Sequence, residues 1–241
     1  MAVQMTPIAT LHTCYKEKFG IPRQPNLVKE ATARLVFSPE FASPEAVREL
    51  EGFSHIWLVF LFHQSIKKGA IKKGAKTWSP MVRPPRLGGN KKVGVFATRS
   101  PFRPNPIGLS AVCLESVEHT AQGPILHLSG VDILDQTPIL DIKPYLPYSD
   151  IIDHARDGFA VGPPQPGLTV EFSPRAMADI GSTQIPNLQP MIKGILENDP
   201  RPAYSKGDNP DRIFGIRLFD FDVKWQVTRD RVRVICLEKK G

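Results

Sequence analysis

The sequence predicts a mainly β protein: a larger N-terminal domain built almost wholly of strands, followed by a small α+β domain. Two observations predict the first domain. Apolar residues recur with a period of two wherever the pattern is legible, and the repeated alternation of strands with helices that marks a parallel βαβ sheet is absent. A Gly/Pro-rich stretch separates the domains. With 241 residues, 41% of them hydrophobic, the chain can bury one good-sized core and a smaller second one.

Local patterns predict the elements of the first domain. The apolar, β-rich run 55–62 is suited to a strand buried on both faces. Ser43 can cap a helix, Pro44 suits its first position, and the apolar stripe stops at Gly52, so one short helix is expected there. Alternating apolar residues predict three further strands, at 93–98, 110–117 and 125–133.

A change of composition places a linker at 151–167, because the Gly and Pro residues crowded there oppose regular structure. We therefore expect the two domains to cover 1–150 and 168–241. The expected elements of the second domain are a strand at 168–172, a helix starting at Ser173-Pro174, a helix at 190–198, and a meander of strands at 213–219, 223–227 and 232–237.

The positive charge is concentrated in one stretch. The formal net charge is +7, and no Asp or Glu occurs between Glu51 and Glu115, where the chain carries 11 Lys or Arg. A surface formed by this stretch is positive and suits an anionic partner without identifying it. Its lysine-rich part, 65–78, is expected to be a solvated loop that adds sequence-independent attraction to a phosphate backbone.

The sequence also limits the compartment. The chain starts without the basic and apolar regions of a signal peptide, and its longest wholly apolar run, 56–62, is too short to span a bilayer as a helix. The three cysteines are far apart and form no CxxC pair, which argues against a disulfide framework or a thiolate zinc site. We therefore expect a cytoplasmic protein with no membrane partner.

Several common functional motifs are missing. The chain has no GxGxxG after a strand, no GxxxxGK[ST], no HExxH and no GxSxG. The missing motifs therefore argue against a dinucleotide-binding enzyme, a P-loop NTPase, a zincin metalloprotease and a hydrolase with a nucleophile elbow. No spacing of histidines or cysteines suggests a metal site, so none is expected.

The segment 94–108 differs from an ordinary turn. Pro101, Pro104 and Pro106 fix the backbone and remove hydrogen-bond donors, so the loop is rigid and holds its side chains in place. Arg99 and Arg103 bring two forked cationic donors to it, and Asn105 adds an amide. A structural turn with solvated arginines is the alternative. Two arginines and an Asn in one rigid loop favour contact with a ligand or a phosphate.

Other polar residues near the predicted strands are open to two interpretations. His63 and Gln64 directly follow an apolar strand, where a histidine is more often a satisfied edge residue than a catalyst. Pro22-Arg-Gln-Pro25 could be only an extended turn. Asp132 and Asp141 belong to a small set of acids close to these strands, and aspartates at strand ends often hydrogen-bond their own backbone.

Several of these segments together identify a family. They are Tyr15-Lys-Glu-Lys-Phe19, Pro22-Arg-Gln-Pro25, Leu50-Glu-Gly-Phe-Ser-His55, Phe62-His-Gln64, Arg83-Pro-Pro-Arg-Leu-Gly-Gly-Asn90, 94–108 and Asp141-Ile-Lys-Pro-Tyr-Leu-Pro147, with Asp199-Pro-Arg-Pro-Ala-Tyr204 and Phe221-Asp-Val-Lys-Trp225 in the tail. The set resembles the TsaA-like (TrmO-type) tRNA N6-threonylcarbamoyladenosine-37 N6-methyltransferases. The resemblance is dense from residue 5 to about 150.

The resemblance implies a non-Rossmann fold: a single-sheet, β-barrel-like domain that binds S-adenosylmethionine, with a small C-terminal domain and frequent dimers. It assigns a set of residues to the cofactor by position: Pro22, Arg23, Gln24, His63, Gln64, Arg99, Leu109, Ser129, Gly130, Val131 and Asp132. Physically, Arg99 can pair with the methionyl carboxylate, Asp132 can meet the ammonium or the ribose hydroxyls, and Leu109 can pack on adenine.

The implied reaction depends mainly on positioning, since a sulfonium methyl is already a strong electrophile. The adenine N6 is delocalised and weakly nucleophilic, so a nearby acceptor could take its proton during transfer. Asp141 and Tyr145 are the candidates for that role. Lys143, Arg103 and Asn105 are the candidates for holding the threonyl carboxylate or a phosphate of the substrate.

The expected partner is tRNA carrying threonylcarbamoyladenosine in the anticodon stem-loop, where bases can be taken out of the stack. A non-catalytic RNA-binding barrel that contacts the anticodon arm is the alternative. A third interpretation, an enzyme that acts on a small phosphorylated molecule, has less support, because the sequence offers no paired carboxylates to hold a metal.

Overall fold

The computed structural model describes residues 3–65, 78–164, 167–201 and 211–240. Most of the lysine-rich segment and Tyr204 lie outside these ranges. Packing divides the chain into two units. The first comprises Met1–Leu11, Arg34–Leu128 and Gln136–Pro163, and the second comprises His12–Ala33, Ser129–Asp135 and Pro164–Gly241. The second unit thus joins the C-terminal part of the chain to two short segments from the N-terminal part.

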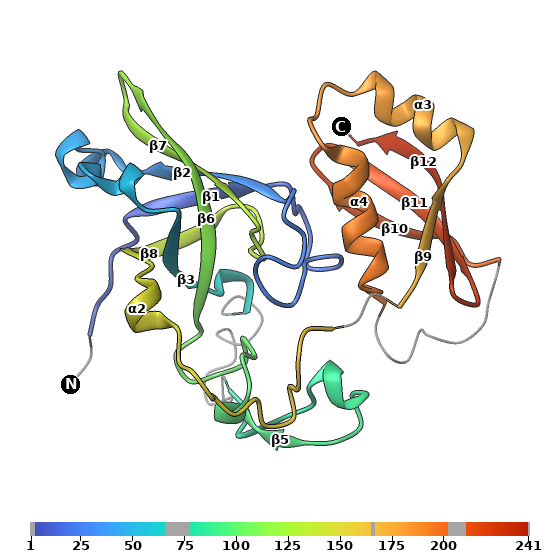
Figure 1. Cartoon of the computed structure of the whole chain (residues 1–241), viewed down its shortest axis with the longest axis horizontal. Helices are drawn as coiled ribbons and strands as arrows, with labels where there is room; N and C mark the ends of the chain where they lie inside the picture. The colour runs from blue at the N-terminus through green and yellow to red at the C-terminus, as the bar shows by residue number, and fades with distance from the viewer. Residues whose placement is uncertain (1–2, 66–77, 165–166, 202–210, 241) are drawn as a thin grey trace, which may run out of the picture. The chain divides into compact units, whose positions relative to one another are not determined.

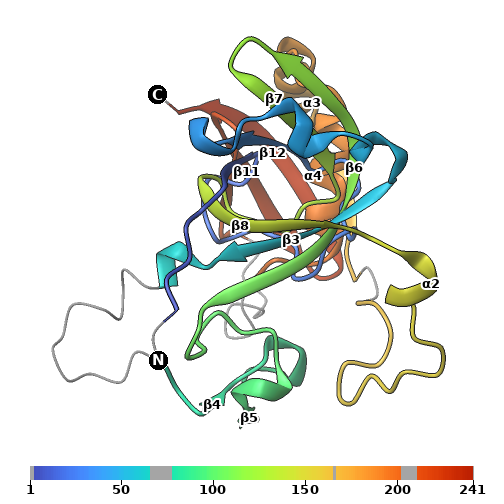
Figure 2. The same cartoon turned by 90° about the vertical axis from the view of Figure 1, so that its left-hand side faces the viewer.

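Six strands close into a barrel in the order β1-β2-β7-β6-β3-β8 (Figures 1 and 2). They are β1 (Ala9–Thr13), β2 (Thr32–Phe37), β3 (His55–Leu61), β6 (Ile107–Thr120), β7 (Gly123–Ser129) and β8 (Thr137–Pro144). Closure of the sheet leaves no open edge, which removes the hazard of unpaired backbone groups. The barrel-like first domain predicted from the resemblance is confirmed.

Alternation along the strands fills the barrel interior. On β3, Ile56, Leu58 and Phe60 are at most 4% exposed, whereas the residues between them are only half-buried. The prediction of a strand buried on both faces is therefore wrong, because one face of β3 is the outer face of the barrel. Gly108 on β6 is needed for this packing: a Cβ there would lie 2.2 Å from the Phe60 ring.

The early helix predicted from Ser43 is wrong in type. In the region 39–52 the chain instead forms the 3-10 helices η1 (Pro39–Phe41), η2 (Pro44–Val47) and η3 (Leu50–Gly52). Glu49 has a φ of 67°, which interrupts any continuous α-helix between the last two. The Ser43 hydroxyl donates to the Glu45 carboxylate and does not cap the helix.

Two predicted strands end earlier than expected. β5 (Val93–Gly94) pairs only with β4 (Met81–Val82), and η5 (Val95–Ala97) follows it directly. β7 ends at Ser129, because Gly130 adopts a φ of 69° and turns the chain. The 110–117 strand is confirmed within the longer β6. The sequence patterns did not predict η4 (Pro85–Leu87) or α2 (Pro147–Asp150).

The C-terminal part forms a four-stranded sheet with two helices, as expected. The sheet order is β10-β11-β12-β9, made of β10 (Phe214–Leu218), β11 (Phe221–Thr228), β12 (Arg231–Lys239) and β9 (Thr169–Phe172), with β9 parallel to β12. The helices are α3 (Pro174–Ser182) and α4 (Leu188–Glu197). The Ser173 hydroxyl accepts a 3.0 Å hydrogen bond from the Ala176 amide, so the predicted cap is confirmed. Within the described residues, no helix has the length and apolar character needed to cross a membrane.

Candidate functional site

One row of side chains crosses three strands on the outer face of the barrel. Val59 on β3 pairs with Leu109 on β6 and with Asp141 on β8, so these three side chains point the same way. Their neighbours Leu58 and Phe60 fill the barrel interior, which leaves the row on the outside. Leu109 is 53% exposed. The row therefore presents an apolar surface and a carboxylate to the solvent, roughly 10 Å apart at two strand spacings.

The predicted residues of β8 and its end lie on this same face. Asp141, Lys143 and Tyr145 are two residues apart, as the strand period requires. Lys143 Nζ lies 3.0 Å from Asp141 Oδ2, and the Asp141 side chain keeps 48% of its surface exposed. The ring of Tyr145 lies 5.6 Å from that of Trp57, and its amide donates to the His55 carbonyl. The structure thus brings together both candidate proton acceptors and one candidate substrate residue.

Asp141 lies within β8 and not at its end, but it does bond its own local backbone, as the simpler interpretation expected. Its Oδ1 accepts a 2.9 Å hydrogen bond from the Ile142 amide, while Oδ2 is paired with Lys143. Neither contact buries the carboxylate. The backbone bond fixes the orientation of the group, and the exposed Lys143 is a partner that a substrate anion could draw away.

The proline-rich loop is held by its own polar groups. The Arg103 guanidinium donates to the Thr98 carbonyl at 2.9 Å, and the Thr98 hydroxyl donates to the Val95 carbonyl at 2.7 Å. The Phe62 amide donates to the Pro106 carbonyl at 2.8 Å, which fixes the base of the loop next to His63. Arg103 therefore has a structural contact in addition to its predicted role. Asn105 shares this base, since its carbonyl accepts from the Ile107 amide at 2.7 Å.

His63 and Gln64 stand where β3 ends, as expected from the sequence. His63 Nδ1 lies 3.5 Å from the hydroxyl of Thr137, the buried first residue of β8. The first unit thus holds His63, Gln64, Arg99, Arg103, Asn105, Leu109, Asp141, Lys143 and Tyr145.

Two aromatic residues of the loop 94–108, a basic loop because it carries Arg99 and Arg103, were not among the predicted site residues. Phe96 is 73% exposed and Phe102 is 52% exposed, and they flank Arg99 in the sequence. The ring of Phe96 stacks with Trp78 at 6.3 Å. Exposed aromatic rings beside basic groups are typical of surfaces on which unpaired bases stack. The sequence did hold a signal for them, because a proline-rich loop has no core for a phenylalanine to fill.

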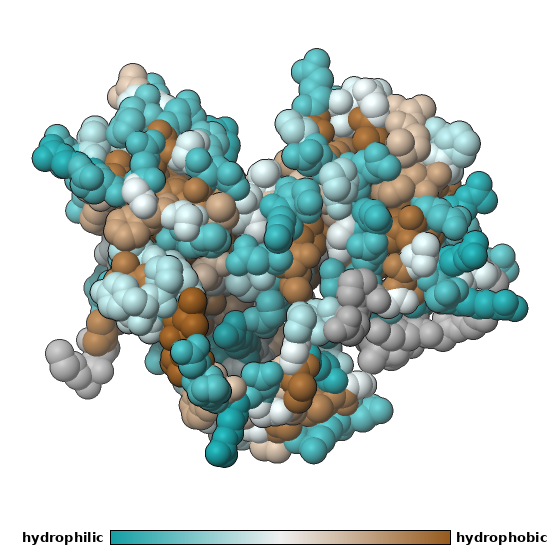
Figure 3. Space-filling view, viewed as in Figure 1, coloured by the Kyte–Doolittle hydropathy of each residue, from teal (hydrophilic) through white to brown (hydrophobic). Residues whose placement is uncertain are grey.

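Apolar residues reach the surface at several places among hydrophilic ones (Figure 3). Exposure alone therefore does not mark a site, and Phe96 and Phe102 differ from the other exposed apolar residues because they lie in a basic loop. Arg86, which lies in one of the segments that carried the family resemblance, donates to the carbonyls of Val161 and Gly162 and ties its loop to the segment after α2.

The remaining predicted cofactor residues belong to the second unit. They are Pro22, Arg23, Gln24, Ser129, Gly130, Val131 and Asp132. The Asn26 amide donates to the Gly130 carbonyl at 2.8 Å, so the two segments lie against each other. A Cβ on Gly130 would lie 2.3 Å from Asn26 Oδ1, and the φ of 69° also requires glycine there.

Arg23 stands next to a charged pair of the C-terminal part. Partial burial lowers the pKa of the Arg23 guanidinium, and the Asp199 carboxylate offsets part of that effect. Asp199 is itself held by Arg201, whose Nε and Nη2 lie 2.8 and 3.2 Å from its two oxygens. Arg201 is only 6% exposed. Asp199 and Arg201 belong to a motif that carried the family resemblance, but no role was predicted for them.

A hollow of about 390 Å³ in the first unit is a poor candidate site. It is lined by Pro44, Glu45, Val47, Arg48, Glu49, Glu51, Gly52, Val117 and His119. Its three glutamates would repel a phosphate, and none of the predicted residues lines it. In the parts of the chain that the structure describes, no group of three or more His, Cys, Asp or Glu could hold a metal ion.

Comparisons with known proteins agree on one family. The family model of the tRNA-methyltransferase O N-terminal domain matches residues 10–151, and the family model of the TrmO C-terminal domain matches residues 165–240. The chain is 42% identical to the Escherichia coli protein named tRNA (adenine(37)-N6)-methyltransferase, over 98% of both chains. It is 46% identical over 239 residues to a Pseudomonas aeruginosa protein named putative S-adenosylmethionine-dependent methyltransferase RcsF, covering 98% of this chain and 97% of that protein.

Solved structures give the same result. A crystal structure of TrmO superposes with a TM-score of 0.78 at 40% identity, covering 98% of this chain and 99% of the other. A TrmO structure from P. aeruginosa superposes with a TM-score of 0.79 at 39% identity, covering 99% and 98%. The two domain models together match residues 10–151 and 165–240, and the two superpositions cover 98% and 99% of the chain, so the chain belongs to the tRNA-methyltransferase O (TrmO) family.

Proposed function

We propose that this chain transfers a methyl group from S-adenosylmethionine to N6 of threonylcarbamoyladenosine at position 37 of tRNA. The names of its relatives support the adenine-37 reaction and the cofactor. Among the structural observations, the row Leu109–Val59–Asp141 carries the proposal, because it sets an exposed apolar surface and a carboxylate on one face. The threonylcarbamoyl group is the finer part of the proposal and rests on the sequence resemblance.

The residues present fit the chemistry of the cofactor. S-adenosylmethionine combines a flat adenosine with a carboxylate, an ammonium and a sulfonium. The exposed Leu109 offers an apolar surface for adenine, and the guanidinium groups of Arg23 and Arg99 suit the carboxylate. The carboxylate of Asp132 suits the ammonium or the ribose hydroxyls. The other residues that we assign to the cofactor are Pro22, Gln24, His63, Gln64, Ser129, Gly130 and Val131.

The protein's own task is to bring the substrate nitrogen in line and to receive its proton. When bound, S-adenosylmethionine supplies an electrophilic methyl group. Asp141 accepts the N6 proton through the carboxylate oxygen that Lys143 holds in the free protein. Lys143 is 67% exposed, so the threonyl carboxylate of the substrate can draw it away and leave that oxygen free. Tyr145, fixed against Trp57, is the other candidate acceptor.

Contact with tRNA is assigned to the positive stretch between Glu51 and Glu115. Its described cations include Arg83, Lys91, Lys92 and Arg99, and its exposed rings include Phe96 and Phe102. Phosphates of the anticodon arm would meet the cations, while a base turned out of the stack would meet the rings. A protein with this partner works in the cytoplasm, which is the localisation we propose.

The outer face of the barrel also supports a homodimer. Leu61 and Ile107 pair in register and are half-buried on the same face of β3 and β6, next to the row of Val59 and Leu109 that we assign to the site. A second copy could cover this apolar strip. We expect wild-type protein to sediment as a dimer and Ile107→Glu to sediment as a monomer, whereas a monomeric wild type would contradict the proposal.

The domain boundaries belong to the same proposal. We assign the methyltransferase barrel to residues 1–150, the linker to 151–167 and the C-terminal domain to 168–241. The described residues between Ile151 and Pro164 form no helix or strand, which is consistent with a linker.

The decisive experiment supplies purified protein with S-adenosylmethionine carrying an isotope-labelled methyl group. The tRNA is prepared with and without the threonylcarbamoyl group at A37, and its nucleosides are analysed by mass spectrometry. We expect label on N6 only where that group is present. Equal labelling of both tRNAs would refute the threonylcarbamoyl part. Tight tRNA binding without cofactor binding would instead favour the alternative, a non-catalytic RNA-binding barrel.

A further inference from the structure

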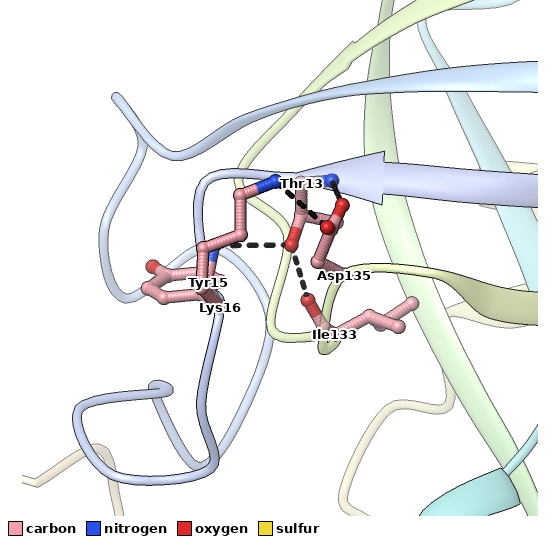
Figure 4. A network of polar contacts seen from close by, with 5 residues as sticks. All are labelled: Thr13, Tyr15, Lys16, Ile133 and Asp135. Atoms are coloured by element: carbon pink, nitrogen blue, oxygen red, sulfur yellow. Dashed lines mark hydrogen bonds and ion pairs between the residues drawn. The ribbon is translucent and has the colours of Figure 1, made fainter. Parts of the chain in front are cut away.

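The segment Tyr15-Lys-Glu-Lys-Phe19 carried part of the family resemblance, but the proposed reaction gives it no role. Here we call residues 13–17 the strap. Figure 4 shows how Asp135 holds the strap: its Oδ1 accepts from the Thr13 amide at 2.8 Å, and its Oδ2 lies 2.7 Å from Lys16 Nζ. The Asp135 amide donates in turn to the Tyr15 carbonyl at 2.9 Å.

A second contact reinforces this junction. The Thr13 hydroxyl donates to the Ile133 carbonyl at 2.9 Å and accepts from the Tyr15 amide at 3.1 Å (Figure 4). The Asp135 side chain is only 12% exposed, so its ion pair with Lys16 is poorly screened by solvent. Residues 133–135 are therefore fixed to the strap by charge and by backbone bonds together.

The other edge of the strap is held by the C-terminal sheet. The Phe219 amide donates to the Cys14 carbonyl at 2.8 Å, and the Arg217 amide donates to the Glu17 carboxylate at 3.0 Å. Tyr15 forms a β-bridge with Leu218 and is fully buried, which raises the pKa of its hydroxyl. β10 thus anchors the strap, and the strap anchors residues 133–135.

The turn 129–132 ends just before residue 133. Its Val131 is 1% exposed, and the Val131 amide donates to the Ala31 carbonyl at 3.3 Å. The Gly130 carbonyl accepts from Asn26, which follows the segment 22–25. All of these contacts lie within the second unit. The turn is therefore fixed from one side by 26–31 and from the other side by Asp135.

We propose that Asp135, paired with Lys16, is a positioning residue that transmits the support of the C-terminal sheet to turn 129–132 and so sets the affinity for S-adenosylmethionine. This inference rests on the proposed assignment of Ser129 to Asp132 to the cofactor. Asp135 does not itself touch the cofactor. Through the strap and Asp135, the C-terminal sheet then acts as a scaffold for the part of the cofactor site that turn 129–132 forms.

The chain offers a control pair that matches Lys16 and Asp135 in distance and exposure. Lys224 Nζ lies 2.7 Å from Asp222 Oδ2, with side chains 26% and 16% exposed, against 30% and 12% for Lys16 and Asp135. Both residues of the control pair lie on β11, which pairs with β10. Their other ion-pair partners are Glu238 and Lys240, so among the described residues the control pair makes no side-chain ion pair with the strap or the turn. The full-length variants to compare are Asp135→Asn, Lys16→Met and the double variant, Asp222→Asn and Lys224→Met as controls, and Asp132→Asn.

The measurements are the Kd for S-adenosylmethionine by titration calorimetry and the Tm of each variant. We expect Asp135→Asn and Lys16→Met each to raise Kd about tenfold, the weight of one charged hydrogen bond. The double variant should be no worse than the more affected single variant, because the same ion pair is broken in each case. The control variants should lower Tm by a similar amount and leave Kd unchanged.

The outcomes separate the inference from the proposal beneath it. If Asp132→Asn raises Kd but Asp135→Asn does not, the positioning role is refuted and the cofactor assignment stands. An equal rise of Kd in the control variants would show a general loss of stability and would also refute the role. If Asp132→Asn leaves Kd unchanged, the assignment of the turn to the cofactor is itself wrong.

Discussion

Asp141 combines a fixed orientation with an exposed oxygen, and this combination suits a proton acceptor. The Ile142 amide holds one of its oxygens, while the other is paired, among the described residues, with the solvent-exposed Lys143. Tyr145 lies on the same face but is packed against Trp57. Two candidates on one face can be separated by kinetics, since a general base acts on the rate of the chemical step.

We expect Asp141→Asn to lower the single-turnover rate of methyl transfer by about 10²- to 10⁴-fold, the usual contribution of a positioned acid or base. The Kd for the cofactor should not change, because the amide keeps the shape of the side chain. Tyr145→Phe is the matched variant, and it should retain most of the rate. The reverse result, a slow Tyr145→Phe and a normal Asp141→Asn, would assign the proton to Tyr145.

The exposed rings of the basic loop give a second prediction at this scale. Phe96→Ala and Phe102→Ala should each weaken tRNA binding by about 1–3 kcal/mol, the weight of one stacked base. Their Tm should stay near that of the wild type, because neither ring is buried. Met177→Ala on α3, also an exposed apolar residue at 42%, is the control and should bind tRNA normally. Filter-binding titrations measure the effect, and unchanged binding in both Phe variants would remove the stacking role.

At the scale of elements, the two Ser-Pro pairs show how far local signals reach. Both Ser43-Pro44 and Ser173-Pro174 predicted a capped helix. Ser173 does cap α3, and its hydroxyl also donates to the Ile235 carbonyl at 2.6 Å. Ser43 precedes a short 3-10 turn and caps nothing. The difference arises because α3 packs against β12, while the turn at Pro44 buries only Val47.

This contrast predicts unequal costs for the same substitution. Ser173→Ala should lower the free energy of unfolding by about 1–2 kcal/mol, because a buried cap is removed. Ser43→Ala should change it by less than about 0.5 kcal/mol, as expected for a surface position. Urea unfolding of both variants checks this. Equal losses would mean that the cap bond of Ser173 contributes nothing beyond an ordinary serine contact.

At the scale of the whole molecule, charge is distributed unevenly along the chain. The formal charge of +7 comes entirely from the stretch between Glu51 and Glu115, which holds 11 of the 31 Lys and Arg residues and none of the 24 Asp and Glu residues. The same stretch holds the proline-rich loop and the strand end at His63. Positive charge therefore accompanies the proposed site in the sequence, as expected for an enzyme whose substrate is a polyanion.

Neutralising cations in this stretch should weaken tRNA binding more than equal changes elsewhere. We expect the triple change of Arg83, Lys91 and Lys92 to Gln to reduce the slope of log K against log salt by roughly 0.7–0.9 for each phosphate that is no longer neutralised. The matched triple change of Lys193, Lys239 and Lys240 to Gln should leave the slope near the wild-type value. Identical slopes in all three proteins would contradict a localised binding surface.

The sequence by itself determined the mainly β fold class and the family, because these depend on local periodicity and on motifs of fixed spacing. It also determined which residue types gather in the loop 94–108. Where a prediction depended on distant packing, it was wrong or incomplete. The expected strand from Val93 to Thr98 is mostly a 3-10 helix, and Arg86 holds the segment at Val161.

Only the tertiary structure decided which residues share a surface. Strand register sets Leu109 and Asp141, 32 positions apart in the sequence, in one row across β3. The junction of Asp135 with Lys16, and of Tyr15 with Leu218, likewise joins segments more than 100 residues apart. Bringing such distant segments together costs loop-closure entropy, and only the complete set of packed contacts offsets this cost. A local sequence pattern therefore does not reveal which distant residues will meet.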